Sequence, residues 1–204
     1  IYFTAGGKEE GNPYHNYYYK VNFDGSNLTN LTPSKGTHSV TFSNDYSMLV
    51  DTYSTTINPP VSVLRNGNGE EILELETADI SELKAKNWQE AVEFSVKARD
   101  EKTDLYGVMF LPSHYDESKK YPVLNYIYPG PQSGSVGNYS FRPVWRDFQA
   151  VSELGFVVVA VDAMGTPMRS KSFHDAYYGN MGDNGLPDNI TAINFTTNSI
   201  IPLL

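Results

Sequence analysis

Two apolar segments on either side of one expected helix constrain the fold of this chain more than any other feature. The first covers residues 121–128 and ends at a Pro-Gly-Pro break, and the second covers residues 156–161. Helix-forming residues at about 144–154 follow a loop rich in Gly, Ser and Pro, and Gly155 stands where the C-cap of a helix belongs. Nearly continuous apolar strands joined through a helix are typical of parallel sheets. The sequence therefore predicts a strand–helix–strand (βαβ) unit over residues 121–161.

Residues 1 to about 77 have the pattern of short β-strands separated by turns. The clearest pair is 61–65 and 71–75, because the Asn-Gly-Asn-Gly between them favours a hairpin turn. Strands at this spacing suit the blades of a β-propeller or a β-sandwich. The other expected strands in this region cover residues 1–4, 17–23, 28–33, 38–43 and 47–54.

The sequence changes character after residue 77. Residues 78–90 combine helix-forming residues with charges, and they predict a short helix in a linker. Residues 94–98 and 105–112 flank a polar turn and predict an antiparallel pair of strands.

Composition excludes several classes of function. The net charge of −9 argues against nucleic acid or an anionic membrane surface as a partner. The absence of cysteine excludes disulfides, thiol catalysis and Cys-ligated zinc within this sequence. The apolar runs are too short to span a bilayer. The sequence begins at Ile1, inside an expected strand and without a signal peptide, and we interpret this start as a cut.

The histidines and the glycine-rich loop do not predict a catalytic or nucleotide site by themselves. All four histidines lie in polar or turn contexts without zinc-ligand spacing, and we expect each of them at the surface: His15, His38, His114 and His174. His174 and Asp175 are adjacent, so their side chains cannot pair as a catalytic dyad on a regular element. Residues 130–137 lack both the Walker and the Rossmann spacing, which favours a plain loop.

Several short motifs, in this order and at this spacing, resemble the dipeptidyl-peptidase IV branch of the prolyl oligopeptidase serine peptidases. The resemblance is collinear from about residue 36 to residue 190. The motifs that carry it are Leu111-Pro112, Lys119-Lys120-Tyr121-Pro122-Val123-Leu124, Tyr128-Pro129-Gly130-Pro131, Phe156 to Asp162 with Gly165, Tyr178-Gly179 and Asp188-Asn189-Ile190.

This resemblance implies a mixed fold, in which the C-terminal part of a β-propeller precedes the N-terminal half of an α/β-hydrolase domain. On that analogy residues 1–77 are the last propeller blades, 78–93 a linker helix and 94–204 an incomplete peptidase domain. It also implies that the hydroxyl of Tyr128 donates to the oxyanion of an acyl-transfer reaction. The parent would release N-terminal dipeptides after proline, without cofactor or metal. It would act on peptides in the periplasm or outside the cell, without nucleic acid or membrane contact in this segment, and could form a homodimer.

The chain departs from the family pattern at three places. No Gly-x-Ser-x-Gly occurs in the 204 residues, and the acid and histidine of a triad are also missing, so we expect the chain alone to be inactive. The usual Asp-x-Arg-Gly reads Asp162-Ala163-Met164-Gly165, which lacks the arginine. Residues 189–204 are uncharged and rich in Ile, Thr and Asn, so we expect a loosely packed tail there instead of an amphipathic helix.

Two other functions stay open at this point. The chain could be a module that binds peptide or glycan without catalysis, or it could belong to an esterase of the same fold. The sequence does not separate a truncated or frameshifted peptidase gene from an evolved pseudoenzyme. A Gly-x-Ser-x-Gly encoded beyond codon 204 would favour the peptidase.

Overall fold

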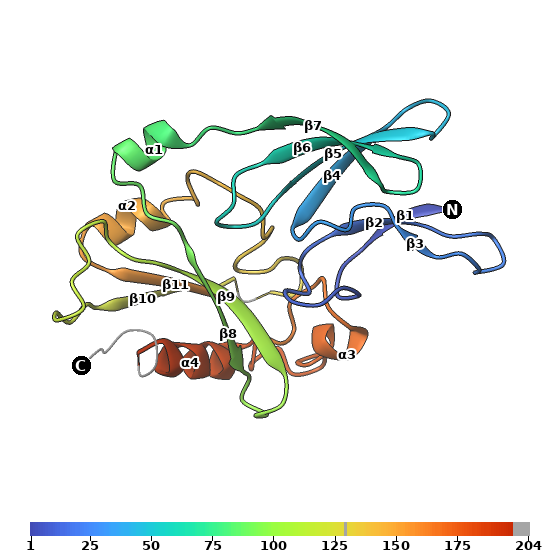
Figure 1. Ribbon diagram of the computed structural model, residues 1–204. Coiled ribbons are helices and arrows are strands. Elements are labelled where there is room, and N and C mark those ends of the chain that lie inside the picture. Colours follow the sequence, from blue (N-terminus) through green and yellow to red (C-terminus); the bar gives the residue numbers. More distant parts are fainter. Residues whose placement is uncertain (129, 198–204) are drawn as a thin grey trace. The chain divides into compact units, whose positions relative to one another are not determined.

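The computed structural model describes residues 1–128 and 130–197 (Figure 1). The chain forms two compact units. The first contains residues 1–82 and 138–142, and the second contains residues 83–137 and those from 143 onward. The assignment of residues 1–77, 78–93 and 94–204 to three segments of a larger protein stays a prediction.

The first unit contains two antiparallel sheets, in which each strand pairs with the next strand along the chain. This confirms the predicted antiparallel β region. Figure 1 shows these strands as successive hairpins. The three-stranded sheet has the order β1 (Tyr2–Ala5), β2 (Tyr17–Lys20) and β3 (Thr29–Asn30), and the four-stranded sheet has the order β4 (Thr37–Phe42), β5 (Met48–Ser54), β6 (Val61–Asn66) and β7 (Glu71–Thr77).

The hairpin between β6 and β7 forms for the reason that its sequence predicts. The side-chain oxygen of Asn66 accepts hydrogen bonds from the backbone N–H groups of Asn68 and Glu70, at 2.9 and 3.1 Å. Gly69 adopts a φ of 88°, in the left-handed region that glycine tolerates best, and its N–H donates to the carbonyl of Asn66. The Asn and Gly residues thus close the turn by their own local hydrogen bonds and backbone freedom.

A group of buried polar side chains joins three strands of the four-stranded sheet. Asp51 on β5 is fully buried, and its Oδ1 lies 2.7 Å from Nδ1 of His38 on β4. Its Oδ2 accepts a hydrogen bond at 2.9 Å from Nε of Arg65 on β6. Ser34 completes the group, because its carbonyl oxygen lies 2.7 Å from His38 Nε2 and its hydroxyl accepts from Arg65 Nη2 at 2.8 Å. We call these four residues the buried charge cluster.

The prediction of four surface histidines is wrong for two of them. His15 and His38 are 1% and 6% exposed, whereas His114 is exposed and His174 is half-buried. Polar neighbours in sequence indicated exposure, but the carboxylate that holds His38 lies 13 positions away on another strand. The residues next to His38 in sequence therefore give no indication that it has this partner.

The second unit contains a mixed four-stranded sheet of order β10-β11-β9-β8. β10 (Val123–Tyr126) and β11 (Val157–Asp162) are parallel, with Val123 opposite Val157, which confirms the predicted βαβ unit. β8 (Val92–Lys97) and β9 (Asp104–Phe110) form the predicted antiparallel pair. Among the described residues, the helices of this unit are α2 (Phe148–Glu153), α3 (Lys171–His174) and α4 (Leu186–Phe195), and α1 (Ser81–Ala85) begins in the first unit and ends in the second.

The first strand and the helix of the βαβ unit, predicted over residues 121–128 and about 144–154, are both shorter in the structure. β10 covers four residues instead of eight. It begins two residues later than predicted, because Tyr121 packs its ring on Tyr115 at 5.1 Å and its hydroxyl accepts from the N–H of Asp116. α2 begins at Phe148 instead of about residue 144, because Arg146 has a φ of 50° and cannot continue a right-handed helix.

Every residue of β11 is buried, so this central strand needs cover on both faces. On one face Val157, Val159 and Val161 pack in a cluster that includes Ala192 of α4. On the other face α2 packs on β11 and β9, where Phe148 meets Phe110 with 5.5 Å between ring centroids. Figure 1 shows the two helices on opposite sides of the sheet.

The prediction of a loosely packed tail is wrong as far as residue 197, and residues 198–204 lie outside the described part of the chain. α4 begins after Gly185, whose φ is 77°, and Pro187 occupies its first turn. Ala192 is fully buried, and Phe195 packs against the core. Contacts with the sheet thus outweigh the poor intrinsic helix propensity of Ile, Thr and Asn.

Asp100 closes the turn between β8 and β9. Its carboxylate accepts hydrogen bonds from the N–H groups of Lys102 and Thr103, at 2.9 and 2.8 Å, and from the Thr103 hydroxyl at 2.6 Å. The Thr103 hydroxyl and then these N–H groups lower the pKa of Asp100 from 3.8 to about 2. Because the folded state favours the charged form, this contribution to stability is complete above about pH 4 and is lost as the pH falls towards 2.

We therefore expect Asp100→Asn to flatten the acid side of the stability curve. Asparagine can keep the turn hydrogen bonds but does not titrate, so the urea midpoint should fall less between pH 4 and pH 2.5 than in the wild type. The control is Glu101→Gln in the same turn, which should leave the slope unchanged. Equal slopes for Asp100→Asn and the wild type would contradict the prediction.

Candidate active site

The carboxyl ends of the parallel strands β10 and β11 carry the residues of the candidate site. In open sheets with parallel strands, ligands bind at this edge. Tyr128 follows β10 by two residues, and Asp162 is the last residue of β11. Residues 130–136, which we call the Tyr128 loop, lie between them along the chain.

Tyr128 combines an accessible side chain with a fixed backbone. It is 38% exposed, and its N–H donates to the hydroxyl of Ser135 at 3.0 Å. Ser135 is 2% exposed, so this contact lies inside the loop. A phenol in this position can donate a hydrogen bond to a ligand at the edge of the sheet.

Asp162 holds the second half of the Tyr128 loop against β11. Its Oδ1 accepts a hydrogen bond at 3.0 Å from the N–H of Val136. Gly134 packs so closely on the same carboxylate that a Cβ would lie 2.5 Å from Oδ1. A side chain at residue 134 would therefore push the loop away from the strand.

His174 holds the first half of the Tyr128 loop. Its Nε2 lies 2.9 Å from the carbonyl oxygen of Pro131. The prediction that His174 and Asp175 form no dyad is confirmed, because Asp175 forms an ion pair with Lys171 on the exposed side of α3. A cavity of about 160 Å³ lies beside this contact and is lined by Pro131, His174, Asp175, Tyr177, Tyr178 and Met181.

The loop after β11 lacks the arginine that the resemblance implies, but hydrogen bonds to α4 and α3 hold it in place. The N–H of Met164 donates to Asp188 of α4 at 3.1 Å, and the N–H of Gly165 donates to the carbonyl of Phe173 at 2.8 Å. The Asp188 carboxylate also accepts from the N–H of Arg99 at 3.1 Å, and the Arg99 guanidinium lies 3.3 Å away. Burial raises the pKa of Asp188, while its contacts with Arg99 act in the opposite direction.

Gly165 is required at its position for two reasons. Its φ is 99°, and an added Cβ would lie 1.7 Å from a ring carbon of Tyr177, which is buried. Overlap with a buried ring has to be relieved by movement of the ring or of the loop.

We expect Gly165→Ala to lower the free energy of unfolding by about 3 kcal/mol, from the left-handed φ and the steric overlap together. Gly155→Ala is the matched control, because Gly155 has nearly the same φ of 97° with nothing within 4 Å of the added Cβ. The control should cost about 1 kcal/mol, from the backbone alone. Equal losses in urea denaturation would show that the Tyr177 contact does not matter.

The two other tyrosines near β10 have structural contacts. Tyr126 packs its ring on Phe148 at 4.9 Å, and its hydroxyl accepts a hydrogen bond from the guanidinium of Arg146. Tyr121 bonds to the backbone of Asp116. Tyr128 thus differs from both in presenting its side chain to solvent at the edge of the sheet.

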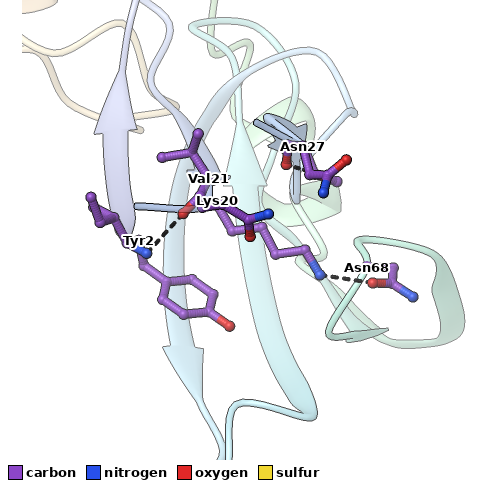
Figure 2. Close-up of a pocket in the computed structure, with 8 residues that line it drawn as sticks. Tyr2, Lys20, Val21, Asn27 and Asn68 are labelled. Atoms are coloured by element: carbon purple, nitrogen blue, oxygen red, sulfur yellow. Dashed lines mark hydrogen bonds between the residues drawn. The ribbon is translucent and has the colours of Figure 1, made fainter. Parts of the chain in front are cut away.

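Figure 2 shows a second cavity, which lies in the first unit. Lys20 extends into it, but its Nζ already donates to Asn68 Oδ1 at 2.7 Å and to the Gly67 carbonyl at 2.6 Å. Among residues 1–128 and 130–197, no group of three or more His, Asp or Glu side chains is placed to bind a metal ion. Within the same residues, no helix has the length and apolar character needed to cross a membrane.

Sequence reasoning selected Tyr128 but missed the residues that fix its surroundings. Each of these residues forms a hydrogen bond with the backbone of another segment: Ser135 with Tyr128, Asp162 with Val136, His174 with Pro131 and Asp188 with Met164. A polar residue that ends a fully apolar strand, such as Asp162, was the available signal. No comparable signal singled out His174.

Two family profiles match the chain. The profile of the prolyl oligopeptidase family matches residues 141–199, and the profile of the dipeptidyl peptidase IV N-terminal region matches residues 1–60. Together they fit a chain that runs from a propeller-type N-terminal region into a hydrolase-type peptidase domain.

Curated relatives match over most of this chain but only part of their own length. Dipeptidyl-aminopeptidase B of Aspergillus niger is 31% identical over 95% of this chain and 21% of its own length. Prolyl endopeptidase FAP of Bos taurus is 36% identical over 66% of this chain and 18% of its own length. The chain thus spans about a fifth of the length of these relatives.

Solved structures match the fold over nearly the whole chain. A dipeptidyl aminopeptidase IV from Bacteroides ovatus superposes with a TM-score of 0.80 and 25% identity, over 97% of this chain and 27% of its own. Dipeptidyl peptidase 4 of Porphyromonas gingivalis has the same fold, with a TM-score of 0.76 and 24% identity over 96% of this chain and 27% of its own. Together with the two profiles and the curated relatives, these likenesses show that the chain belongs to the dipeptidyl-peptidase IV branch of the prolyl oligopeptidase family.

Proposed function

We propose that this chain is part of a serine-type dipeptidyl peptidase, in which Tyr128 donates a hydrogen bond to the oxyanion of the acyl-transfer step. The substrate class is peptides with proline in second position, from which an N-terminal dipeptide is released. The names of the relatives support the dipeptidyl peptidase activity. The observation that carries the role of Tyr128 is its exposed side chain on a fixed backbone at the carboxyl edge of β10 and β11.

The chemistry needs a donor that is in place before charge develops. When a serine hydroxyl attacks the peptide carbonyl, its proton passes to a base, and the carbonyl oxygen gains a negative charge in the tetrahedral intermediate. A donor aimed at that oxygen stabilises the transition state by about 3 kcal/mol. The hydrogen bond from Tyr128 N–H to Ser135 restrains the backbone that carries this phenol.

The 204 residues supply the donor but not the nucleophile, because they contain no Gly-x-Ser-x-Gly. We therefore propose that residues 1–204 alone have no peptidase activity. By the resemblance, residues 1–77 belong to the last propeller blades and residues from 94 onward to the hydrolase domain. A periplasmic or extracellular location and a homodimer of the parent are further parts of this proposal.

The test compares residues 1–204 with the longest protein that the gene encodes, using Gly-Pro 4-nitroanilide as substrate. The longer protein should release nitroaniline and lose this activity with a serine-directed phosphonate, whereas residues 1–204 should show neither turnover nor labelling. Hydrolysis of 4-nitrophenyl acetate without hydrolysis of the anilide would support the esterase instead. No turnover of either substrate by the longer protein would overturn the proposed activity and favour the binding module.

A further inference from the structure

The proposed reaction assigns no role to the contact between His174 and the Tyr128 loop. A backbone carbonyl can only accept a hydrogen bond, so the His174 Nε2 that lies 2.9 Å from the Pro131 oxygen carries a proton and donates it. The two residues are 43 positions apart in sequence. The bond therefore ties the loop that follows Tyr128 to a different element, α3.

α3 is a rigid support for this bond although it is short. Ser170 caps it by accepting a hydrogen bond from the N–H of Phe173 at 3.2 Å. Phe173 is buried in the core beside β11, and the guanidinium of Arg169 covers its ring at 4.6 Å. His174 follows Phe173 directly, so its backbone is fixed by the core of the unit.

The loop is held differently at its two ends. The second half is fixed by Val136 N–H on Asp162 and by the close packing of Gly134 on the same carboxylate. In the first half, the hydrogen bond from His174 reaches the carbonyl of Pro131, three positions after Tyr128. Loss of that bond would let the first half of the loop move while the second half stays on β11.

We propose that His174 is a positioning residue that holds Tyr128 in place through Pro131. Its effect on the loop follows from the structure of this chain alone, and its effect on turnover rests on the proposed function. A neutral or a protonated imidazole can both donate from Nε2, so the role requires the donor and not a charge.

The first experiment measures amide hydrogen exchange in residues 1–204 by mass spectrometry. His174→Leu keeps the volume without a donor, and His174→Gln keeps an N–H donor on a side chain of similar reach. Leucine should speed exchange of residues 130–133 about fivefold, as expected for one lost hydrogen bond, and leave residues 134–136 unchanged, while glutamine stays within about twofold of the wild type throughout. His114→Leu, an exposed histidine of the same unit, is the control and should change nothing.

Two results would overturn the proposal in this experiment. Unchanged exchange of residues 130–133 in His174→Leu would show that the bond does not restrain the first half of the loop. Loss of protection in β11 as well would show a role in the whole unit instead of local positioning of the Tyr128 loop.

The second experiment measures Gly-Pro 4-nitroanilide hydrolysis by the longest protein that the gene encodes. His174→Leu should lower kcat about tenfold with KM within about twofold, and His174→Gln should restore at least half of the wild-type kcat. A rise of KM alone, or no rescue by glutamine, would contradict a positioning role. If the wild type has no turnover, the proposed function fails, and the exchange experiment still decides whether His174 restrains the loop.

Discussion

Replacement of Tyr128 by phenylalanine is expected to lower kcat for Gly-Pro 4-nitroanilide by about 10²- to 10³-fold in the longest protein that the gene encodes. The variant removes one hydroxyl and keeps the ring, so KM should stay within about twofold, because the lost interaction belongs to the transition state. The hydrogen bond from the N–H of residue 128 to the Ser135 hydroxyl does not involve the phenol and should persist. Steady-state kinetics with wild type and variant at one pH provide the measurement.

Tyr126→Phe is the matched control for this prediction. It removes a phenol two positions earlier, whose hydroxyl pairs with Arg146 and whose ring packs on α2. We expect its kcat to stay within about threefold of the wild type, because the lost contact is made against α2, which packs on one face of the sheet. Equal losses in the two variants would remove Tyr128 from the reaction and reduce its role to packing.

The elements predicted best from the sequence are those whose pattern depends on near neighbours. β11 (Val157–Asp162) was found because Gly155 separates a helix from the apolar run of Phe156 to Val161. The β6–β7 hairpin was found because Asn66 and Gly69 close its turn locally. Such signals are contained in windows shorter than ten residues.

The elements predicted worst depend on contacts with distant residues. α4 looked like a poor helix because propensity is a weak term, whereas its burial against the sheet decides the outcome. The start of α2 was placed too early because nothing in the sequence shows the positive φ of Arg146. The same limit hid His38, whose polar neighbours in sequence suggested a surface position.

In the candidate site, one residue was predicted from the sequence and its contacts with distant residues were not. Tyr128 could be selected because an apolar strand delivers it to a Pro-Gly-Pro break and because the surrounding motifs resemble a peptidase family. The contacts that hold the loop after it could not be predicted, since Asp162 and His174 reach that loop from 26 and 43 positions away. A sequence can therefore point to a candidate site residue, while the contacts around that residue emerge only from the fold.

The second large effect is expected in the buried charge cluster, where Asp51→Asn should lower the free energy of unfolding by about 3–5 kcal/mol. Asp51 is fully buried and accepts from Arg65 at 2.9 Å, and Arg65 is 2% exposed. Asparagine offers one acceptor instead of two, so either His38 or Arg65 faces an N–H donor. The guanidinium also loses its buried counter-ion, because the other carboxylate beside it, Glu71, lies 3.7 Å away and is exposed. Urea denaturation gives the loss, and amide exchange over β4–β6 locates it.

Glu10→Gln is the control, because Glu10 is an exposed loop residue of the same unit, and its urea midpoint should stay close to that of the wild type. A double-mutant cycle with Arg65→Met separates the free energy lost with the Asp51–Arg65 ion pair from the free energy lost with the Asp51 carboxylate itself. If the damage comes from the unpaired guanidinium, Asp51→Asn should cost about 1–3 kcal/mol less in the Arg65→Met background than in the wild type. Strictly additive losses, or a midpoint for Asp51→Asn equal to that of the control, would show that the cluster does not hold β4, β5 and β6 together.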